Sequence, residues 1–153
     1  MTITFDGPIT RIIGVDPGLT PGFVLLNLDR DVLEQPADVA QCSARLLYTL
    51  VATFNADRDA LIAVERFVPR GRLTAEQRVT QAQAENLTRI HPRVVQRPAA
   101  AVKPWATDER LAAAGLLEAC KGMRHARDAA RHALYAAVHD AGLPDPLSKS
   151  WNR

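Results

Sequence analysis

RIIGVD, from Arg11 to Asp16, is a short apolar run, rich in β-branched residues, that ends on a carboxylate, and this pattern predicts a buried β-strand. The turn-forming pair Pro17-Gly18 follows at once. A second apolar run, FVLLNL from Phe23 to Leu28, comes soon enough to return antiparallel beside the first. The two runs predict an opening β-hairpin with Asp16 at the end of its first strand.

Strand-like and helix-like segments alternate through the rest of the chain. Apolar residues at helical spacing predict a helix from Asp38 to Phe54, and the continuous apolar run from Ala60 to Glu65 is typical of a strand covered on both faces. Further segments are predicted as a helix over 74–90, a strand over 93–96, a helix from Thr107 that is broken near Gly122, and a last helix over 124–139. This order indicates an α/β domain with a mixed sheet over residues 1–143, followed by a flexible polar tail over 144–153.

Composition excludes several classes of protein. The 153 residues are 47% hydrophobic and 24% charged, which is typical of one globular domain. The start of the chain lacks a basic segment followed by a long apolar run, and no stretch reaches the roughly 18 apolar residues of a membrane span, so we expect a cytoplasmic protein that does not associate with membranes. Cys42 and Cys120, in segments interpreted as helices, belong to no C-x-x-C pair, so we expect reduced thiols and no zinc site.

The net charge of +2 conceals a strong asymmetry along the chain. The segment from Arg66 to Lys103 contains eight basic and two acidic residues, whereas the remainder contains 11 basic and 15 acidic residues. Such a division is typical of a phosphate-binding face beside a carboxylate-rich centre that binds cations. A solvated arginine-rich face would produce the same pattern, and charge alone leaves both interpretations open.

Three acidic residues stand at the ends of predicted elements. Asp16 ends the first strand, Glu65 ends the buried strand, and Asp128 lies in the first turn of the last helix. In open α/β sheets sites gather outside the strand ends, and clustered carboxylates repel one another unless a divalent cation such as magnesium neutralises them. Taken singly, each has a structural interpretation: a turn start, a surface charge, or favourable electrostatics near a helix N-terminus. Together they predict a metal site.

The motifs around these acids resemble those of the RuvC family of Holliday-junction resolvases, which belong to the ribonuclease H-like nucleases. IIGVDPGLTPGF, from Ile12 to Phe23, looks like the family's first-strand motif, and IAVERF, from Ile62 to Phe67, resembles the second, which ends in a glutamate. Val94-Val95 and the segment 100–103 resemble the fifth strand and the approach to its next helix. His125 and Asp128 occupy the positions of an H-x-x-D motif in the closing helix. The resemblance runs from about residue 11 to residue 137.

This resemblance implies a fold, an activity and a set of site residues. The fold would be a ribonuclease H-like mixed five-stranded sheet flanked by helices. Asp16, Glu65 and Asp128 would bind Mg²⁺, with Mn²⁺ able to substitute, and His125 would ligate a metal, steer the water or contact the scissile phosphate. A homodimer joined through the helix at 74–90 would nick four-way DNA junctions symmetrically, in the cytoplasm of a bacterium or a phage-infected host. The residues implied for DNA contact are Arg66, Phe67, Arg70, Arg72, Arg78 and Lys103.

Two departures from the family pattern affect these expectations. Arg131-His132 follows the final aspartate where many bacterial members have a second aspartate or alanines, which looks more like phage-encoded relatives. His132 is interpreted as a local partner, with a role in the site left open. The family's aromatic wedge lies three residues after the glutamate, where this chain has Val68, so Phe67 is either the wedge or a core residue.

Two other functions stay open at this point. One is a ribonuclease H-like nuclease acting on RNA or RNA/DNA hybrids, and the other is a junction-binding protein without catalysis. Whether a branch-migration partner exists is not specified by the sequence.

Overall fold

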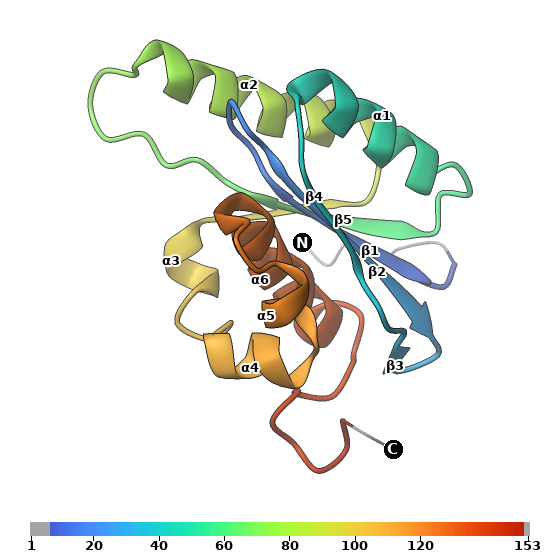
Figure 1. Ribbon diagram of the computed structural model, residues 1–153. Helices are drawn as coiled ribbons and strands as arrows, with labels where there is room; N and C mark the ends of the chain where they lie inside the picture. Colours follow the sequence, from blue (N-terminus) through green and yellow to red (C-terminus); the bar gives the residue numbers. More distant parts are fainter. Residues whose placement is uncertain (1–6, 152–153) are drawn as a thin grey trace.

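A mixed β-sheet with helices on both faces organises the chain in a computed structural model that describes residues 7–151 (Figure 1). Within these residues the strands are β1 (Arg11–Asp16), β2 (Gly22–Asp29), β3 (Val32–Leu33), β4 (Asp38–Gln41), β5 (Ala60–Glu65) and β6 (Val94–Arg97). The helices are α1 (Ala44–Phe54), α2 (Ala75–Ile90), α3 (Ala99–Val102), α4 (Asp108–Ala113), α5 (Leu116–Ala119) and α6 (Arg124–His139). The expected α/β class with a mixed, helix-flanked sheet is confirmed.

The direction of the strands places two acidic residues at one edge of the sheet. The strand order is β3-β2-β1-β5-β6, with β4 paired to the other part of β2. β1 runs antiparallel to β2 and parallel to β5, and Val15 pairs with Val64. The next residues along these two parallel strands are Asp16 and Glu65, so both carboxylates leave the sheet at the same edge.

Side chains of the central strands alternate between two hydrophobic cores, as the pleat requires. On one face Ile12 packs in a cluster with residues of α4, α5 and α6, while on the other Ile13 and Val15 pack with residues of α1 and α2. Figure 1 shows the same division, with α1 and α2 above the sheet and α3 to α6 below it. The buried strands β1 and β5 therefore hold their terminal carboxylates on a rigid base.

Helix α6 lies unusually close to β1 and β2 because small residues face each other across the contact. Its buried face is rich in alanine, including Ala126, Ala129 and Ala133. A Cβ added to Gly14 of β1 would lie 2.2 Å from the Ala129 carbonyl oxygen, and one added to Gly22 of β2 would lie 2.0 Å from the His125 carbonyl oxygen. This close approach brings the first turns of α6 to the edge of the sheet where Asp16 emerges.

Four details of the structure differ from the predicted elements. The segment 38–41 is strand β4 rather than helix, because it pairs with the edge of β2. The helix begins only after Ser43, whose side chain accepts a hydrogen bond from the Leu46 amide. Cys42 therefore lies before the helix and is not helical. The helix after Thr107 ends at Ala113, and the left-handed Gly115 (φ 73°) separates it from α5. Within the described residues the sheet has six strands, not the five that the resemblance implies. The strand β3 has only two residues, which is too short a pattern to predict from the sequence. Asp128 lies in the second turn of α6, not the first.

The segment after α6 returns to α4. Leu143 and Pro146 are buried, Asp145 pairs with Arg110, and the Trp151 indole Nε1 donates to the Ala113 carbonyl at 3.2 Å. The boundary at residue 143 and the flexible tail stay predictions, and residues 152–153 lie outside the described part. No helix of the described residues is long and apolar enough to cross a bilayer.

Candidate functional site

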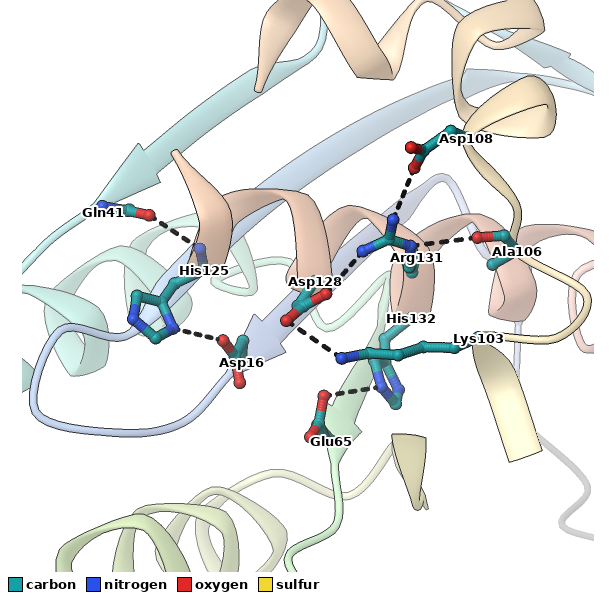
Figure 2. Close-up of polar contacts among 10 residues, drawn as sticks. All are labelled: Asp16, Gln41, Glu65, Lys103, Ala106, Asp108, His125, Asp128, Arg131 and His132. Atoms are coloured by element: carbon teal, nitrogen blue, oxygen red, sulfur yellow. Dashed lines mark hydrogen bonds and ion pairs between the residues drawn. The ribbon is translucent and has the colours of Figure 1, made fainter. Parts of the chain in front are cut away.

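Asp16, Glu65 and Asp128 come from three elements and project toward one region beside the sheet edge (Figure 2). Asp16 is the last residue of β1, Glu65 the last of β5, and Asp128 stands on α6. The exposed fractions of their side chains are only 12%, 24% and 15% respectively. These acids therefore lie in a partly desolvated environment, where their negative charges must be compensated.

The pKa of Asp16 is shifted by its burial and by the neighbouring carboxylates. Burial, aided by the nearby negative charges of Glu65 and Asp128, raises the pKa of this carboxyl to about 6 despite the lowering effect of His125. Carboxylates that disfavour one another's ionisation are close enough to share one electrostatic environment. A bound divalent cation would neutralise such mutual repulsion.

His125 is held against Asp16 from two directions. Its Nδ1 lies 2.8 Å from Asp16 Oδ2, within hydrogen-bond distance, and its backbone amide donates to the Gln41 side-chain oxygen at 2.8 Å (Figure 2). Gln41 of β4 therefore caps an N-terminal amide of α6, since Met123 at the cap position has no capping side chain. Sequence reasoning missed Gln41, because the segment containing it was predicted as helix.

Asp128 is paired with two cations. Lys103 Nζ lies 3.2 Å from Asp128 Oδ2, and Arg131 Nη1 donates to Asp128 Oδ1 at 2.7 Å. Arg131 also donates to Asp108 at 2.6 Å and to the Ala106 carbonyl at 3.2 Å. Arg131, which sequence reasoning noted only as a departure from the family pattern, thus ties the carboxylate to the start of α4.

Glu65 faces His132, the residue that follows Arg131 and that also departs from the family pattern. His132 Nε2 lies 3.2 Å from Glu65 Oε2, but the two groups are not aligned as a hydrogen bond, so both atoms are buried without a hydrogen-bond partner. His132 itself is only 2% exposed. A buried carboxylate oxygen without a hydrogen bond is costly unless another ligand satisfies it.

The residues fit a divalent cation in chemistry but not as a preformed cage. Their donors are carboxylate oxygens and an imidazole, and magnesium takes such oxygen ligands while keeping several waters. Among residues 7–151, however, no three His, Cys, Asp or Glu side chains are arranged to hold one ion together. Instead the carboxylates lie against histidine, lysine and arginine side chains, so binding a metal requires rearrangement. The ligand set Asp16, Glu65 and Asp128 stays a prediction.

The loop after Asp16 is anchored by Gln83 of α2. The Gln83 side chain, 3% exposed, donates to the Gly18 carbonyl at 2.8 Å and accepts from the Gly18 amide at 3.0 Å. This pair of hydrogen bonds fixes the chain where it leaves β1 and connects α2 to the site. A polar residue within a predicted polar helix carries no sequence signal of such a role.

Comparisons with known proteins place the fold. The chain matches no protein-family model and no curated protein sequence. Among solved structures it is similar to T. thermophilus RuvC in complex with a Holliday junction substrate, with 20% sequence identity and a TM-score of 0.57 over 84% of this chain and 92% of that one. The fold is RuvC-like. At this identity the likeness establishes the fold alone.

On this RuvC-like fold, the residues predicted to contact DNA divide into two groups. Arg66, Arg70 and Arg72 lie exposed in the long loop between β5 and α2, here called the basic loop (residues 66–73), which extends away from the sheet (Figure 1). Arg78 is exposed on α2, and no ion pair within residues 7–151 engages these four. Lys103 differs, because it pairs with Asp128. Another arginine of the basic segment, Arg97, is committed to an ion pair with Asp140.

Phe67 is neither a core residue nor fully exposed. It is half-buried and lines a hollow between the basic loop and α2, together with Arg66, Gln81 and Gln96. It belongs to neither hydrophobic cluster. Its role as a wedge stays a prediction.

Proposed function

We propose that this protein is a magnesium-dependent endonuclease that resolves four-way junctions and related branched DNA by paired nicking. The observation that carries the proposal is the convergence of Asp16, Glu65 and Asp128 at one edge of the sheet, where burial and mutual repulsion raise the pKa of Asp16 to about 6. The RuvC-like fold and the junction bound by its structural neighbour support it. Arg131-His132 supports a phage-like member of that group.

The proposed mechanism assigns a task to each residue at the edge. Asp16, Glu65 and Asp128 would hold the magnesium, which when bound supplies activation of water and neutralisation of phosphate charge. His125 hydrogen-bonds to Asp16 through Nδ1. A proton on Nδ1 leaves Nε2 as an acceptor, so His125 is placed to take a proton from the attacking water. No serine or cysteine nucleophile is required.

The proposed DNA contact uses the basic loop beside this centre. Arg66, Arg70 and Arg72 carry charges that no described residue neutralises, so they are available to phosphates. Phe67 is proposed to unstack bases at the branch point. The homodimer is proposed through α2, whose Val79 and Ile90 are 37% and 63% exposed, because two-fold protein symmetry matches the symmetry of a junction.

The experiment that tests the function compares substrates with and without Mg²⁺. Purified protein is incubated with four-way, forked and linear DNA and with an RNA/DNA hybrid, and the nicked strands are mapped. Symmetric paired nicks in the four-way DNA, dependent on Mg²⁺ or Mn²⁺, are the expected result. Preferred cleavage of the hybrid would instead indicate a ribonuclease H-like activity, and tight junction binding without cleavage would indicate a non-catalytic protein.

Replacing Arg70 and Arg72 together with alanine is expected to weaken junction binding and to flatten its salt dependence. Each phosphate contact releases counterions, so losing two should lower the slope of log affinity against log salt by about 2. Fluorescence anisotropy between about 50 and 200 mM salt, a range over which two phosphate contacts change the affinity roughly 10-fold, measures the slope.

The matched control removes two arginines at the opposite end of the sheet. Arg30 and Arg58 are exposed there and both have a φ of 56°, which glycine adopts freely, so Arg30→Gly/Arg58→Gly removes the same charge without strain. Equal slopes for the two double variants would mean that net charge, not the basic loop, drives binding.

A further inference from the structure

Arg131 and Lys103 hold the two oxygens of Asp128 in very different ways. The Arg131 guanidinium, 17% exposed, is fixed at three points by Asp128 Oδ1, Asp108 and the Ala106 carbonyl. The Lys103 side chain is 43% exposed and makes one contact, at 3.2 Å, with Asp128 Oδ2. Figure 2 shows the guanidinium between Asp108 and Asp128, while the lysine approaches Asp128 from the side of Glu65.

These contacts distinguish a permanent partner from a replaceable one. A guanidinium is a planar fork that orients a carboxylate, and the arginine's other bonds reach the segment at the start of α4, so releasing Asp128 Oδ1 would break an anchored network. A lysine ammonium on a flexible, half-exposed stem loses little by moving to solvent or to a phosphate. Asp128 therefore has one committed oxygen, Oδ1, and one available oxygen, Oδ2.

We infer that Arg131 is a positioning residue that aims Asp128 Oδ2 at the cation site, and that Lys103 neutralises this oxygen until a divalent cation takes its place. The inference rests on the proposed function, because it presupposes that Asp128 is a ligand. Asp108, exposed at the start of α4, extends the positioning by holding the far side of the guanidinium.

The test is a titration of the protein with Mn²⁺ alone, without DNA, followed by the electron paramagnetic resonance signal of the free ion. Arg131→Lys keeps the charge but loses the fork, and we expect it to bind Mn²⁺ on the order of 10-fold more weakly, as partners that orient metal ligands commonly do. Lys103→Met removes the competing cation and is expected to bind Mn²⁺ more tightly than the wild type. A purely electrostatic role for Arg131 would leave Arg131→Lys unchanged.

A second measurement separates positioning from folding. In nicking assays Arg131→Lys should need more Mn²⁺ for half-maximal rate, with the KM for the junction unchanged. Should Arg131→Lys fail to fold by circular dichroism, Asp108→Asn carries the same test, with a smaller weakening expected because Asp108 is exposed.

The outcomes distinguish this inference from the proposed function. If the wild type binds Mn²⁺ and Asp16→Asn does not, while the folded Arg131 or Asp108 variant binds like the wild type, the positioning role is wrong and the metal centre stands. Weaker Mn²⁺ binding by Lys103→Met would likewise overturn the assignment of Oδ2. If the wild type and Asp16→Asn both fail to bind, or bind equally, the proposed metal centre itself is wrong.

Discussion

Asp16→Asn is expected to slow magnesium-dependent nicking of a four-way junction on the order of 10³-fold. The proposed metal contributes several kcal/mol of transition-state stabilisation, and each 1.36 kcal/mol lost costs tenfold in rate. Asparagine keeps the size of the side chain and can still hydrogen-bond to His125, so the loss reports the missing charge. Single-turnover cleavage at saturating protein measures the chemical step without binding. Retained nicking by this variant would refute the proposed mechanism.

The matched control for this variant is Asp29→Asn. Asp29 is an exposed acid at the far end of β2, where the same chemical change leaves the site intact. We expect its nicking rate to equal that of the wild type. A comparable loss in both variants would point to net charge rather than to a ligand.

The same variant should be more stable than the wild type when metal is removed. Burial and the neighbouring acids raise the pKa of Asp16 to about 6 from 3.8, so ionised Asp16 opposes folding. This penalty is absent below about pH 4, grows as pH rises, and is complete above about pH 6, where it amounts to at most about 3 kcal/mol. Urea unfolding in chelator at pH 4 and pH 7.5 measures it: Asp16→Asn gains stability at the higher pH only. Added Mg²⁺ should stabilise the wild type alone.

The elements that carry the carboxylates were predictable because each has a continuous signal. β1, β5 and α6 were predicted at or near their observed bounds, since a buried strand is an unbroken apolar run and a packed helix repeats its apolar residues at a fixed spacing. Their order and the parallel pairing of β1 with β5 then place Asp16 and Glu65 at one edge. The position of the site thus follows from local patterns and the geometry of parallel strands.

The contacts that shape the site were not predictable, because they join residues far apart in the sequence. Gln41 and Gln83 are polar residues in polar segments, and only the fold brings them to the His125 amide and to Gly18. The segment 38–41 satisfies a helical spacing but pairs with the edge of β2, so tertiary hydrogen bonding overrides local pattern. Likewise the sequence marked Arg131 only as a departure from the family pattern and Lys103 only as part of a basic segment, and neither spacing nor composition indicates that both contact Asp128.

Gly22→Ala is expected to disrupt both the fold and the proposed activity, because it opposes the contact that brings α6 to Asp16. Gly22 pairs with Asp16 across the hairpin, and its added Cβ would lie 2.0 Å from the His125 carbonyl oxygen and 2.6 Å from the Ala126 nitrogen. These are backbone atoms of α6, which cannot rotate away as a side chain can, so the whole helix must shift. Overpacking of this kind costs about 1–3 kcal/mol, and a displacement near 1 Å at a catalytic group costs on the order of 10²-fold in rate.

The matched control for Gly22→Ala is Gly18→Ala, four residues earlier in the same hairpin. A Cβ at Gly18 would meet only Thr80 Oγ1, at 3.9 Å, which is an ordinary contact, so near wild-type stability and nicking are expected. Urea unfolding and single-turnover cleavage, measured on both variants, separate the loss of stability from the loss of rate. If folded Gly22→Ala nicks junctions as fast as Gly18→Ala, then α6 can move without moving the reacting groups. His125 and Asp128 would then not owe their function to the close packing of this helix on the hairpin.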